Sequence, residues 1–276
     1  MAQHLTQGGY RIVEAPPLGQ TPAGPGKTDA WDALSAARST LVTELDHLRD
    51  RRSGELGATL NILTTAREQM RADKVGSTTA LTALLRTHAL GIDASKALTK
   101  AQIRTVAAWR PRQEGLGVAS ARAEARHAQH INQLDQELKD NQQRLSALVA
   151  EHAPSLLGMF GLGPATAATV LTVWSHPGRI RSEGAFAQIA GACPIPASSG
   201  NTRRPRLSRG GDRQLNRALH TIVLTRMSKD QATRGYVQRR TAEGRTKHEI
   251  MRCLKRYVSR QIYRTLAAVP PVSLAA

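Results

Sequence analysis

Apolar residues recur three and four positions apart through most of this chain, which is the spacing of amphipathic helices. The longest such run extends from about Ala119 to His152. Its apolar stripe has a heptad-like register and consists of Ile131, Leu134, Leu138, Leu145 and Leu148. Asn141 lies within this stripe, and a polar residue in a coiled-coil seam often sets register or partner. The pattern predicts a long helix that forms either a coiled coil or an intramolecular helical hairpin.

The N-terminal region mixes strand and helix patterns. Residues 10–15, YRIVEA, predict a short strand, and residues 16–27 are too rich in Pro and Gly for a regular element. A helix is expected to begin near Thr28. Its apolar stripe is expected at Leu34, Ala37, Leu41, Leu45 and Leu48. Because one strand cannot make a sheet, we interpret this region as a short remnant of an α/β domain.

The remaining patterns are helical. The helices of residues 55–109 are expected to break near Gly76, Gly91 and Pro111. Two further helices are expected, one capped by Asp212 and one from about Lys247 to Ala267. The predicted fold class is therefore mainly α. We expect three segments: an N-terminal remnant (1–50), a helical linker and coiled coil (51–154) and a C-terminal domain (155–276).

Composition narrows the class of partner. The 276 residues include 39 Lys and Arg against 21 Asp and Glu, and the formal net charge is +18. Such a charge indicates binding to nucleic acid, or with less support to an anionic membrane. The sequence has no run of about 18 apolar residues and no signal-peptide pattern. Its two distant cysteines, Cys193 and Cys253, predict neither a disulfide framework nor a zinc site. We expect a cytoplasmic protein without a membrane partner.

The turn GLGP, residues 161–164, lies between two apolar helical patterns. This arrangement is typical of a helix-hairpin-helix, in which Gly161 and Gly163 would let the backbone approach a DNA phosphate. The alternative is a plain connection with proline in the first helical turn.

Two acids lie three positions apart at the start of the first predicted helix, in KTDAWDA. At this spacing Asp29 and Asp32 share a helix face and can reach one cation such as Mg²⁺. Acids in a first turn also stabilise the helix dipole, and the pattern alone favours that role. Glu14, at the strand end, is a third candidate carboxylate that the spacing does not require.

The stretch ASSGNTRRPRLSRGG, residues 197–211, places hydroxyls beside arginines and contains no acid. Ser198 and Ser199 precede Gly200, and a serine becomes a nucleophile when its proton is removed and the developing charge is stabilised. The candidate cations are Arg203, Arg204, Arg206 and Arg209, followed by Arg213 and Arg217 on the next helix. The alternative is a polar loop whose arginines only track a nucleic-acid backbone.

The order of these motifs resembles the insertion-sequence one-ten family of DEDD transposases (IS-110/IS-116/IS-902 type). Its Gly-(Ile/Leu)-Gly-Pro turn is similar to GLGPATAATVL, and its Ser-Gly pair and following helix are similar to AGACPIPASSG and LSRGGDRQLNRAL. The N-terminal KTDAWDALSAA resembles the family's Lys-Ser/Thr-Asp-x-x-Asp-Ala segment. The resemblance extends over both ends and most of the chain.

The resemblance implies a mechanism. In the family, a RuvC-like domain with three Asp and one Glu binds Mg²⁺, and a serine of the C-terminal domain joins DNA strands. It implies that Asp29 and Asp32 are metal-binding catalytic acids and that Ser199 is the nucleophile, with Ser198 as the adjacent alternative. It also implies DNA and a structured guide RNA as partners. The same resemblance implies a bacterial, nucleoid-associated homodimer or tetramer assembled through the coiled coil.

One departure from the family affects the expected activity. The family's first Asp and its Glu belong to strands that have no counterpart here, so we expect a truncated RuvC-like domain that is weakly active or inactive. One alternative is a non-catalytic helix-hairpin-helix protein that holds DNA or structured RNA. Another is a Holliday-junction nuclease that uses only carboxylates.

Overall fold

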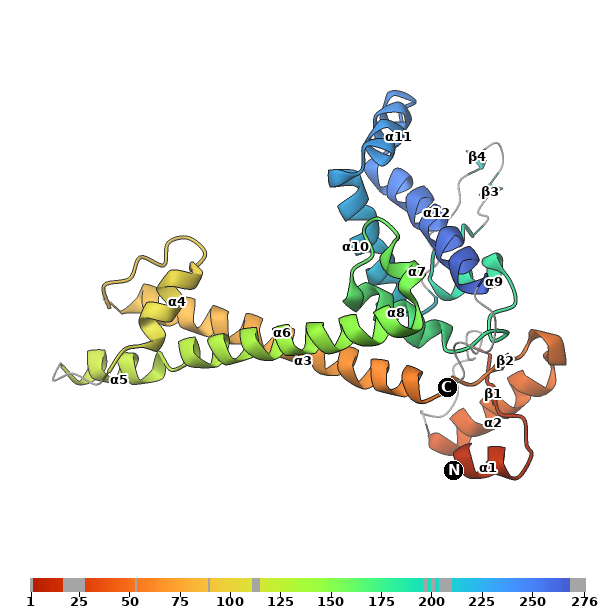
Figure 1. Cartoon of the computed structure of the whole chain (residues 1–276), viewed down its shortest axis with the longest axis horizontal. Helices are drawn as coiled ribbons and strands as arrows, with labels where there is room; N and C mark the ends of the chain where they lie inside the picture. Colours follow the sequence, from red (N-terminus) through yellow and green to blue (C-terminus); the bar gives the residue numbers. More distant parts are fainter. Residues whose placement is uncertain are drawn as a thin grey trace. The chain divides into compact units, whose positions relative to one another are not determined.

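The protein is mainly helical, as predicted, in a computed structural model that describes residues 2–16, 28–52, 54–88, 90–110, 115–195, 198–199, 202–203 and 210–268 (Figure 1). The helices of the first half are α1 (Ala2–Gln7), α2 (Asp29–Leu41), α3 (Glu55–Thr87), α4 (Lys100–Ala107), α5 (Leu116–Glu124) and α6 (His127–His152), with a 3-10 turn at Leu45–His47. The later helices are α7 (Pro154–Leu157), α8 (Pro164–Trp174), α9 (Glu183–Ile189), α10 (Arg213–Lys229), α11 (Gln231–Ala242) and α12 (Lys247–Ala267). The strands are β1 (Val13–Glu14), β2 (Arg49–Asp50), β3 (Ser198–Ser199) and β4 (Thr202–Arg203).

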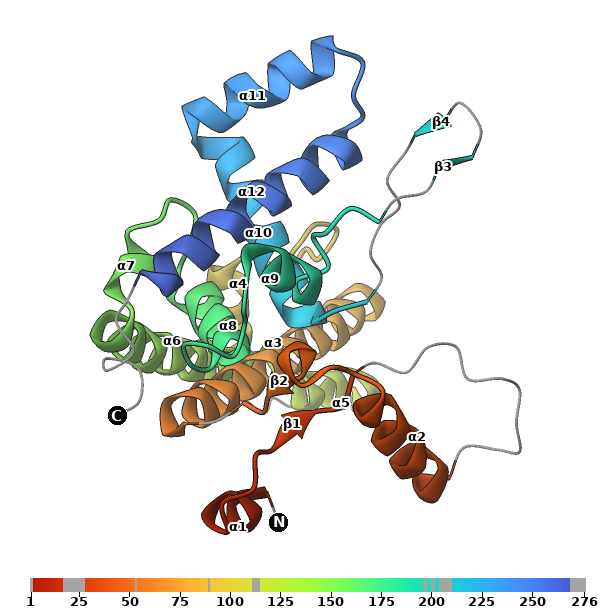
Figure 2. The ribbon, with the colours of Figure 1, turned by 90° about the vertical axis from the view of Figure 1, so that its right-hand side faces the viewer.

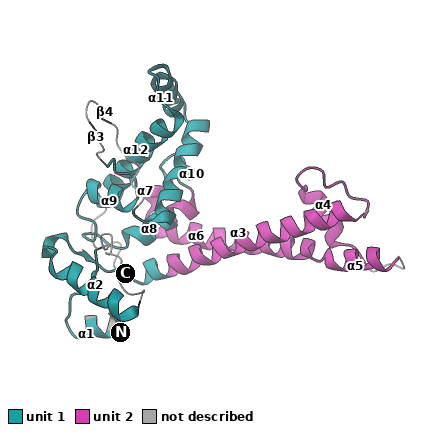
Figure 3. Ribbon diagram, turned by 180° about the vertical axis from the view of Figure 1, so that it is seen from behind, with its two compact units in different colours: residues 1–58, 158–162, 169–276 teal, residues 59–157, 163–168 magenta. Residues whose placement is uncertain are grey.

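The chain divides into two compact units, coloured separately in Figure 3. Unit 1 contains residues 1–58, 158–162 and 169–276, and unit 2 contains residues 59–157 and 163–168. The N-terminal residues thus belong to the same compact unit as the C-terminal helices. Among the described residues, none of the helices is long and apolar enough to cross a membrane.

Unit 2 is built on α3 and α6, which pair through a buried polar contact. Asn141, only 6% exposed, donates from Nδ2 to the carbonyl of Leu63 at 3.0 Å. Arg67 donates from Nη1 to the Leu138 carbonyl (3.0 Å) and to Asn141 Oδ1 (3.2 Å), and burial lowers the pKa of Arg67. Leu63 is paired with Asn141 and the later Arg67 with the earlier Leu138, so the two helices run in opposite directions. Helices α3 and α6 therefore form an antiparallel hairpin within one chain. Self-association through α6 stays a prediction.

Two predicted helix boundaries in this unit are wrong. The single helix expected from Ala119 to His152 is two helices. Between α5 and α6 the backbone makes hydrogen bonds between residues three positions apart, such as Ala128 N–H to Ala125 O at 2.9 Å, in place of the four-residue spacing of an α-helix. The break expected at Gly76 does not occur, and α3 runs through it. A glycine inside a helix costs only about 1 kcal/mol relative to alanine, which the buried residues of the same helix can offset. Gly91 does break the pattern, at φ +79°.

A hydrophobic cluster closes the end of unit 2 formed by α4, α5 and the start of α6. Its buried members include Leu81, Leu85, Ile103, Val106, Ala121, Ala125 and Ile131. A capping box fixes the start of α4, because Thr99 accepts from the Gln102 backbone N–H and the Gln102 side chain accepts from the Thr99 N–H. This end of unit 2 is therefore a packed core of its own.

The helix predicted near Thr28 is present as α2, with Thr28 as its N-cap. Its predicted apolar stripe is wrong within the helix, since α2 buries none of its residues and Leu34 and Leu41 are 43% and 84% exposed. Beyond the helix, Leu45 is 70% exposed in the turn that follows, while Leu48 is buried. Val42 ends the helix with its N–H bonded to the carbonyls of Arg38 and Thr40. Helical spacing alone therefore did not locate a buried face here.

The C-terminal part of unit 1 has an aromatic core. Trp174, Phe186 and Tyr263 meet with ring centroids 5.5–6.3 Å apart, and the two Trp174 contacts are edge-on. This is a favourable aromatic geometry. Helix α12 packs against α9 and α10, as Figure 2 shows, and buries Ile250, Leu254, Val258, Ile262 and Leu266. The predicted helix from Lys247 to Ala267 is confirmed with these bounds.

Asn141→Ala is predicted to destabilise unit 2. The change removes partners from the Arg67 guanidinium and the Leu63 carbonyl, and an unsatisfied buried polar group costs about 1–3 kcal/mol. Asn132→Ala, in the same helix, is the matched control and should change stability by less than about 0.5 kcal/mol. Denaturant unfolding followed by circular dichroism measures both. Equal stabilities of the two variants would contradict the role given to Asn141.

Candidate nucleic-acid interface

Helices α10, α11 and α12 are strongly basic. Residues 212–267 contain fourteen Lys and Arg and four Asp and Glu. Each of the four acids is engaged in local structure, and three of them cap helices. Asp212 caps α10, Asp230 caps α11 and Glu249 completes the capping box of α12. Hydrogen bonds from Thr233 lower the pKa of Asp230, while Glu243 pairs with Arg240. The carboxylates of these helices are therefore already paired with groups of the protein itself.

Several of the basic residues are also structural. Arg226 donates to the Phe160 carbonyl at 2.8 Å and to Gln261 at 2.7 Å, and burial lowers its pKa. Arg260 and Arg264 both pair with the carboxylate of Glu183, at 3.1 and 2.5 Å. The hydrogen bond from Arg264 lowers the pKa of Glu183. These arginines bind helices to one another and are not counted in a ligand surface.

Seven of the remaining basic residues are exposed, and we call this set the basic surface. It consists of Arg213, Arg217, Lys229, Arg234, Arg239, Arg245 and Lys247. An aromatic pair lies among them, with the Tyr236 and Tyr257 rings 6.0 Å apart and the Arg239 guanidinium 5.5 Å from the Tyr236 ring. Burial raises the pKa of Tyr236, and neighbouring Cys253 adds to the effect. Arginines interleaved with aromatic rings are typical of surfaces that bind nucleic acid.

The segment that carries the serines begins and ends at one fixed point. Helix α9 ends at Ile189, and the chain returns where the Asp212 N–H donates to the Ile189 carbonyl at 2.7 Å. Gly211 has φ +107°, and a Cβ there would lie 2.4 Å from the Ile189 carbonyl oxygen. Only glycine fits this close approach. The geometry fixes both ends of the serine and arginine segment against unit 1.

The serines themselves are described only as backbone. Strands β3 and β4 are antiparallel, with Ser198 opposite Arg203 and Ser199 opposite Thr202. The predicted cations Arg204, Arg206 and Arg209 lie outside the described residues. The roles predicted for Ser199 and for this group of arginines therefore stay predictions.

A lysine and an asparagine join the base of that segment to α12, a contact that sequence reasoning missed. Asn216 donates to the Ala190 carbonyl at 2.7 Å and accepts from Lys255 Nζ at 2.8 Å. Burial lowers the pKa of Lys255, and burial followed by the Lys255 charge lowers that of His220. Asn216 is a polar residue on the core side of an amphipathic helix, and this feature of the sequence could have indicated a structural role for it.

The GLGP turn packs tightly, although its predicted phosphate contact stays a prediction. Gly161 has φ +84°, and a Cβ there would lie 3.2 Å from the Ile222 carbonyl oxygen of α10. The positive φ and the close approach to Ile222, which belongs to the same unit, are enough to require glycine at position 161. At Gly163, the backbone N–H donates to the Thr166 hydroxyl at 3.0 Å. The preceding helix, α7, has only four residues.

Asp29 and Asp32 both lie in the first turn of α2 and are exposed. The described residues contain no group of three or more His, Cys, Asp or Glu that could hold a metal ion. The two carboxylates could supply part of a Mg²⁺ site, because Mg²⁺ is often held by one or two carboxylates, waters and substrate phosphates. Their metal role stays a prediction.

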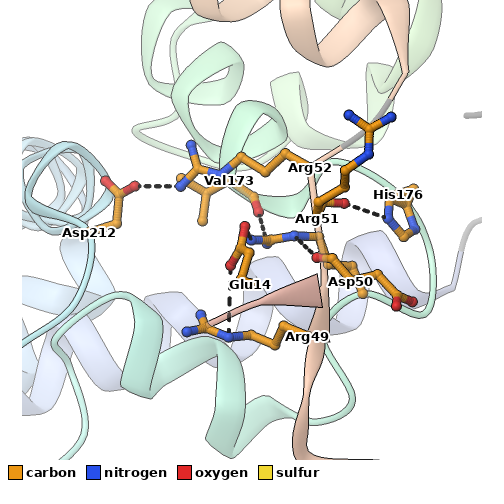
Figure 4. Close-up of polar contacts among 9 residues, drawn as sticks. Glu14, Arg49, Asp50, Arg51, Arg52, Val173, His176 and Asp212 are labelled. Carbon is orange, nitrogen blue, oxygen red and sulfur yellow. Dashed lines mark hydrogen bonds and ion pairs between the residues drawn. The ribbon is translucent and has the colours of Figure 1, made fainter. Parts of the chain in front are cut away.

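Glu14, the third candidate carboxylate, has a structural partner (Figure 4). Arg179, 3% exposed, donates to Glu14 Oε1 at 2.5 Å, to the Val173 carbonyl at 2.6 Å and to the Asp50 carbonyl at 3.1 Å. The Arg179 guanidinium is buried and its donors bind groups inside unit 1, so Arg179 is a structural residue. Arg181, two residues on, is exposed.

A second ion pair links the N-terminal segment to the start of α10. Arg52 Nη2 lies 2.9 Å from Asp212 Oδ2, and the other Asp212 oxygen accepts from the Leu215 N–H at 3.0 Å. Nearby, His176 Nε2 lies 3.4 Å from the Arg51 carbonyl. Figure 4 shows the contacts of Arg52 with Asp212 and of His176 with the Arg51 carbonyl. The base of the serine segment is therefore braced from the N-terminal side as well.

Basic, mainly helical domains are typical of proteins that act on nucleic acid, and in this chain the basic helices directly follow a serine and arginine segment. Residues 153–238 match the family model described as "Transposase IS116/IS110/IS902 family". A relative, the "Insertion element IS110 uncharacterized 43.6 kDa protein" of Streptomyces coelicolor, is 34% identical over 106 residues. Those residues are 37% of this chain and 26% of the relative, so the match spans about a quarter of the relative's length.

The two matches confirm the resemblance to the IS110 family, and the family model places the region of similarity to its transposase domain at residues 153–238. This domain contains α7 to α10, most of α11 and the serine and arginine segment.

Gly211→Ala is predicted to destabilise the base of the serine segment. The added Cβ meets the Ile189 carbonyl at a backbone conformation that alanine rarely adopts, and such strain costs of order 1–3 kcal/mol. Gly210→Ala is the matched control, because a Cβ there meets nothing within 4 Å. Thermal unfolding of both variants checks this, and a melting temperature for Gly211→Ala equal to that of Gly210→Ala would refute it.

Arg179→Ala is predicted to cost about 3–5 kcal/mol, because it leaves the partly buried Glu14 carboxylate and two carbonyls without their donor. Arg181→Ala removes an equal charge two residues away and should cost less than about 0.5 kcal/mol. Urea unfolding of the two variants is the measurement. A small effect at Arg179 would show that Glu14 finds another partner or stays solvated.

Proposed function

We propose that this chain binds DNA through its transposase domain and acts in insertion-sequence recombination with Ser199 as the nucleophile. The observation that carries the proposal is the basic surface, whose residues run from α10 to the start of α12. The acids of these helices are bound within the local structure, while the arginines and lysines of the surface are exposed. Lys and Arg that neutralise phosphates release counterions, and this supplies sequence-independent affinity. The proposal is also supported by the contacts that hold the start and the end of the serine segment to unit 1, at Ile189 and Asp212.

The proposed chemistry is a transesterification. The Ser199 oxygen attacks phosphorus of a DNA phosphodiester and loses its proton to a base. The bond to the departing sugar oxygen breaks, and that oxygen takes up a proton. The product is a phosphoserine link that preserves the phosphodiester for rejoining. Arginines of the segment, Arg203 and Arg204 among them, would offset the charge on the phosphoryl oxygens.

Mg²⁺ is the proposed cofactor, with Asp29 and Asp32 as two of its ligands. When bound, it would polarise a phosphoryl oxygen and lower the pKa of a bound hydroxyl or water. Both carboxylates lie in one exposed helical turn, which leaves room for substrate phosphates. A structured guide RNA and a homodimer or tetramer formed through α6 belong to the same proposal.

Duplex DNA binding is predicted to weaken steeply with salt. Replacing Arg234, Arg239 and Lys247 with Ala should flatten the plot of log affinity against log salt by about 0.9 per lost phosphate contact. The matched control replaces Arg71, Lys139 and Arg144, which are exposed on α3 and α6. Fluorescence anisotropy of labelled duplex at several salt concentrations measures the slopes. Equal slopes for the two variants would remove the basic surface from the interface.

The nucleophile is tested separately from binding. Ser199→Ala should retain duplex affinity and lose the covalent DNA–protein adduct formed with a nicked substrate and Mg²⁺. An adduct that persists in Ser199→Ala and disappears in Ser198→Ala would place the nucleophile one residue earlier. An adduct that survives both changes would exclude serine chemistry here. DNA binding without an adduct in the parent protein would favour the non-catalytic alternative.

A further inference from the structure

A cleft in unit 2, far along the sequence from the transposase domain, combines arginines with a tryptophan. It lies between the end of α4 and the α5–α6 junction and has a volume of about 220 Å³. Its charged and polar lining is Arg110, Arg122, Arg126 and Gln129. The apolar lining includes Val106 and Ala125, which belong to the buried cluster of this unit. The cleft therefore has a rigid apolar floor and a basic rim.

The Arg122 guanidinium lies over the Trp109 ring in this cleft, and we call this pair the platform. The Arg122 guanidinium carbon lies 4.7 Å from the centroid of the Trp109 ring, which is a cation–π contact. Trp109 is half-buried and packs against the hydrophobic cluster, so the core holds its ring in place. Nucleic-acid bases stack on aromatic rings and on the planes of arginine guanidinium groups.

The charge around the platform suits a phosphate. Arg110 and Arg126 are exposed on the rim. The acid in this part of the described chain, Glu124, lies 3.3 Å from Arg126 in a pair whose side chains are 71% and 53% exposed. Such an exposed pair contributes little and is readily exchanged. A phosphate can therefore replace Glu124 as the partner of Arg126. An arginine guanidinium can bind a phosphate through two parallel hydrogen bonds, in a bidentate geometry.

The size of the cleft limits what can enter. Clefts that enclose a drug-sized molecule typically measure about 300–1,000 Å³, and this one is smaller. It suits one planar ring with its phosphate on the rim. Gln129 donates to the Ala107 carbonyl at 3.1 Å, which leaves its amide oxygen to accept from a base edge.

We propose that this cleft binds an unpaired nucleotide of a nucleic acid, with the base stacked on the Arg122–Trp109 platform and the adjacent phosphate held by Arg110 and Arg126. The proposal rests on the proposed function in that it takes nucleic acid as the ligand class. It adds a second site, on unit 2, that selects single-stranded over duplex regions. The unpaired nucleotide can belong to RNA or to DNA, which share this chemistry.

The test uses the full chain with labelled oligothymidylate, oligouridylate and a DNA duplex as probes. Arg122→Lys keeps the charge but removes the planar guanidinium, and it should weaken single-strand binding at least about fivefold, since stacking of one base contributes about 1–3 kcal/mol. Arg110→Ala with Arg126→Ala should flatten the single-strand salt dependence by about 0.7 per lost phosphate contact. The control pair, Lys139→Ala with Arg144→Ala, should change neither.

Each outcome is decisive. Weaker binding of either oligonucleotide with unchanged duplex affinity supports the site, and the probe that loses more identifies RNA or DNA as its source. Unchanged single-strand affinity in Arg122→Lys, or equal losses for duplex and single strand, overturns it. If variants of the basic surface still lose duplex affinity while cleft variants lose nothing, the inference fails and the proposed function stands. A parent protein that binds none of the probes would overturn both.

Discussion

The buried guanidinium of Arg179 is the interaction on which the arrangement of unit 1 depends. It donates hydrogen bonds to the Glu14 carboxylate of β1, to the Asp50 carbonyl of β2 and to the Val173 carbonyl near the end of α8. Strands of two residues each cannot hold a sheet by themselves. The N-terminal segment therefore keeps its place because a charged group, costly to bury alone, requires these partners.

That anchoring reaches the candidate reaction site through a short chain of contacts. The β2 end carries Arg52, which pairs with Asp212, and Asp212 both caps α10 and bonds to the end of α9. Gly211 permits the close approach that closes this base. The serine segment thus leaves and returns at a point that contacts from both ends of the chain hold in place, and α10, which carries Arg213 and Arg217, begins there.

Elements defined by local chemistry were predictable from the sequence. The helix start near Thr28, the cap Asp212 and the helix Lys247–Ala267 were predicted correctly, because capping side chains and helical periodicity are local signals. The α3–α6 hairpin was left open against a coiled coil, since Asn141 indicates a polar seam without naming its partner. The role of Arg179 was missed for the same reason. A buried ion pair between residues 165 positions apart leaves no pattern in the spacing of either residue.

Hydrogen–deuterium exchange with and without duplex DNA tests the central claim, that the chain binds DNA through its basic surface. The account predicts slower exchange in peptides that cover the start of α10 and the α11–α12 connection, where exposed arginines and lysines gather. Peptides from the middle of α3 and α6 should exchange at unchanged rates. Protection confined to α3 and α6, with none in α10 to α12, would contradict the account.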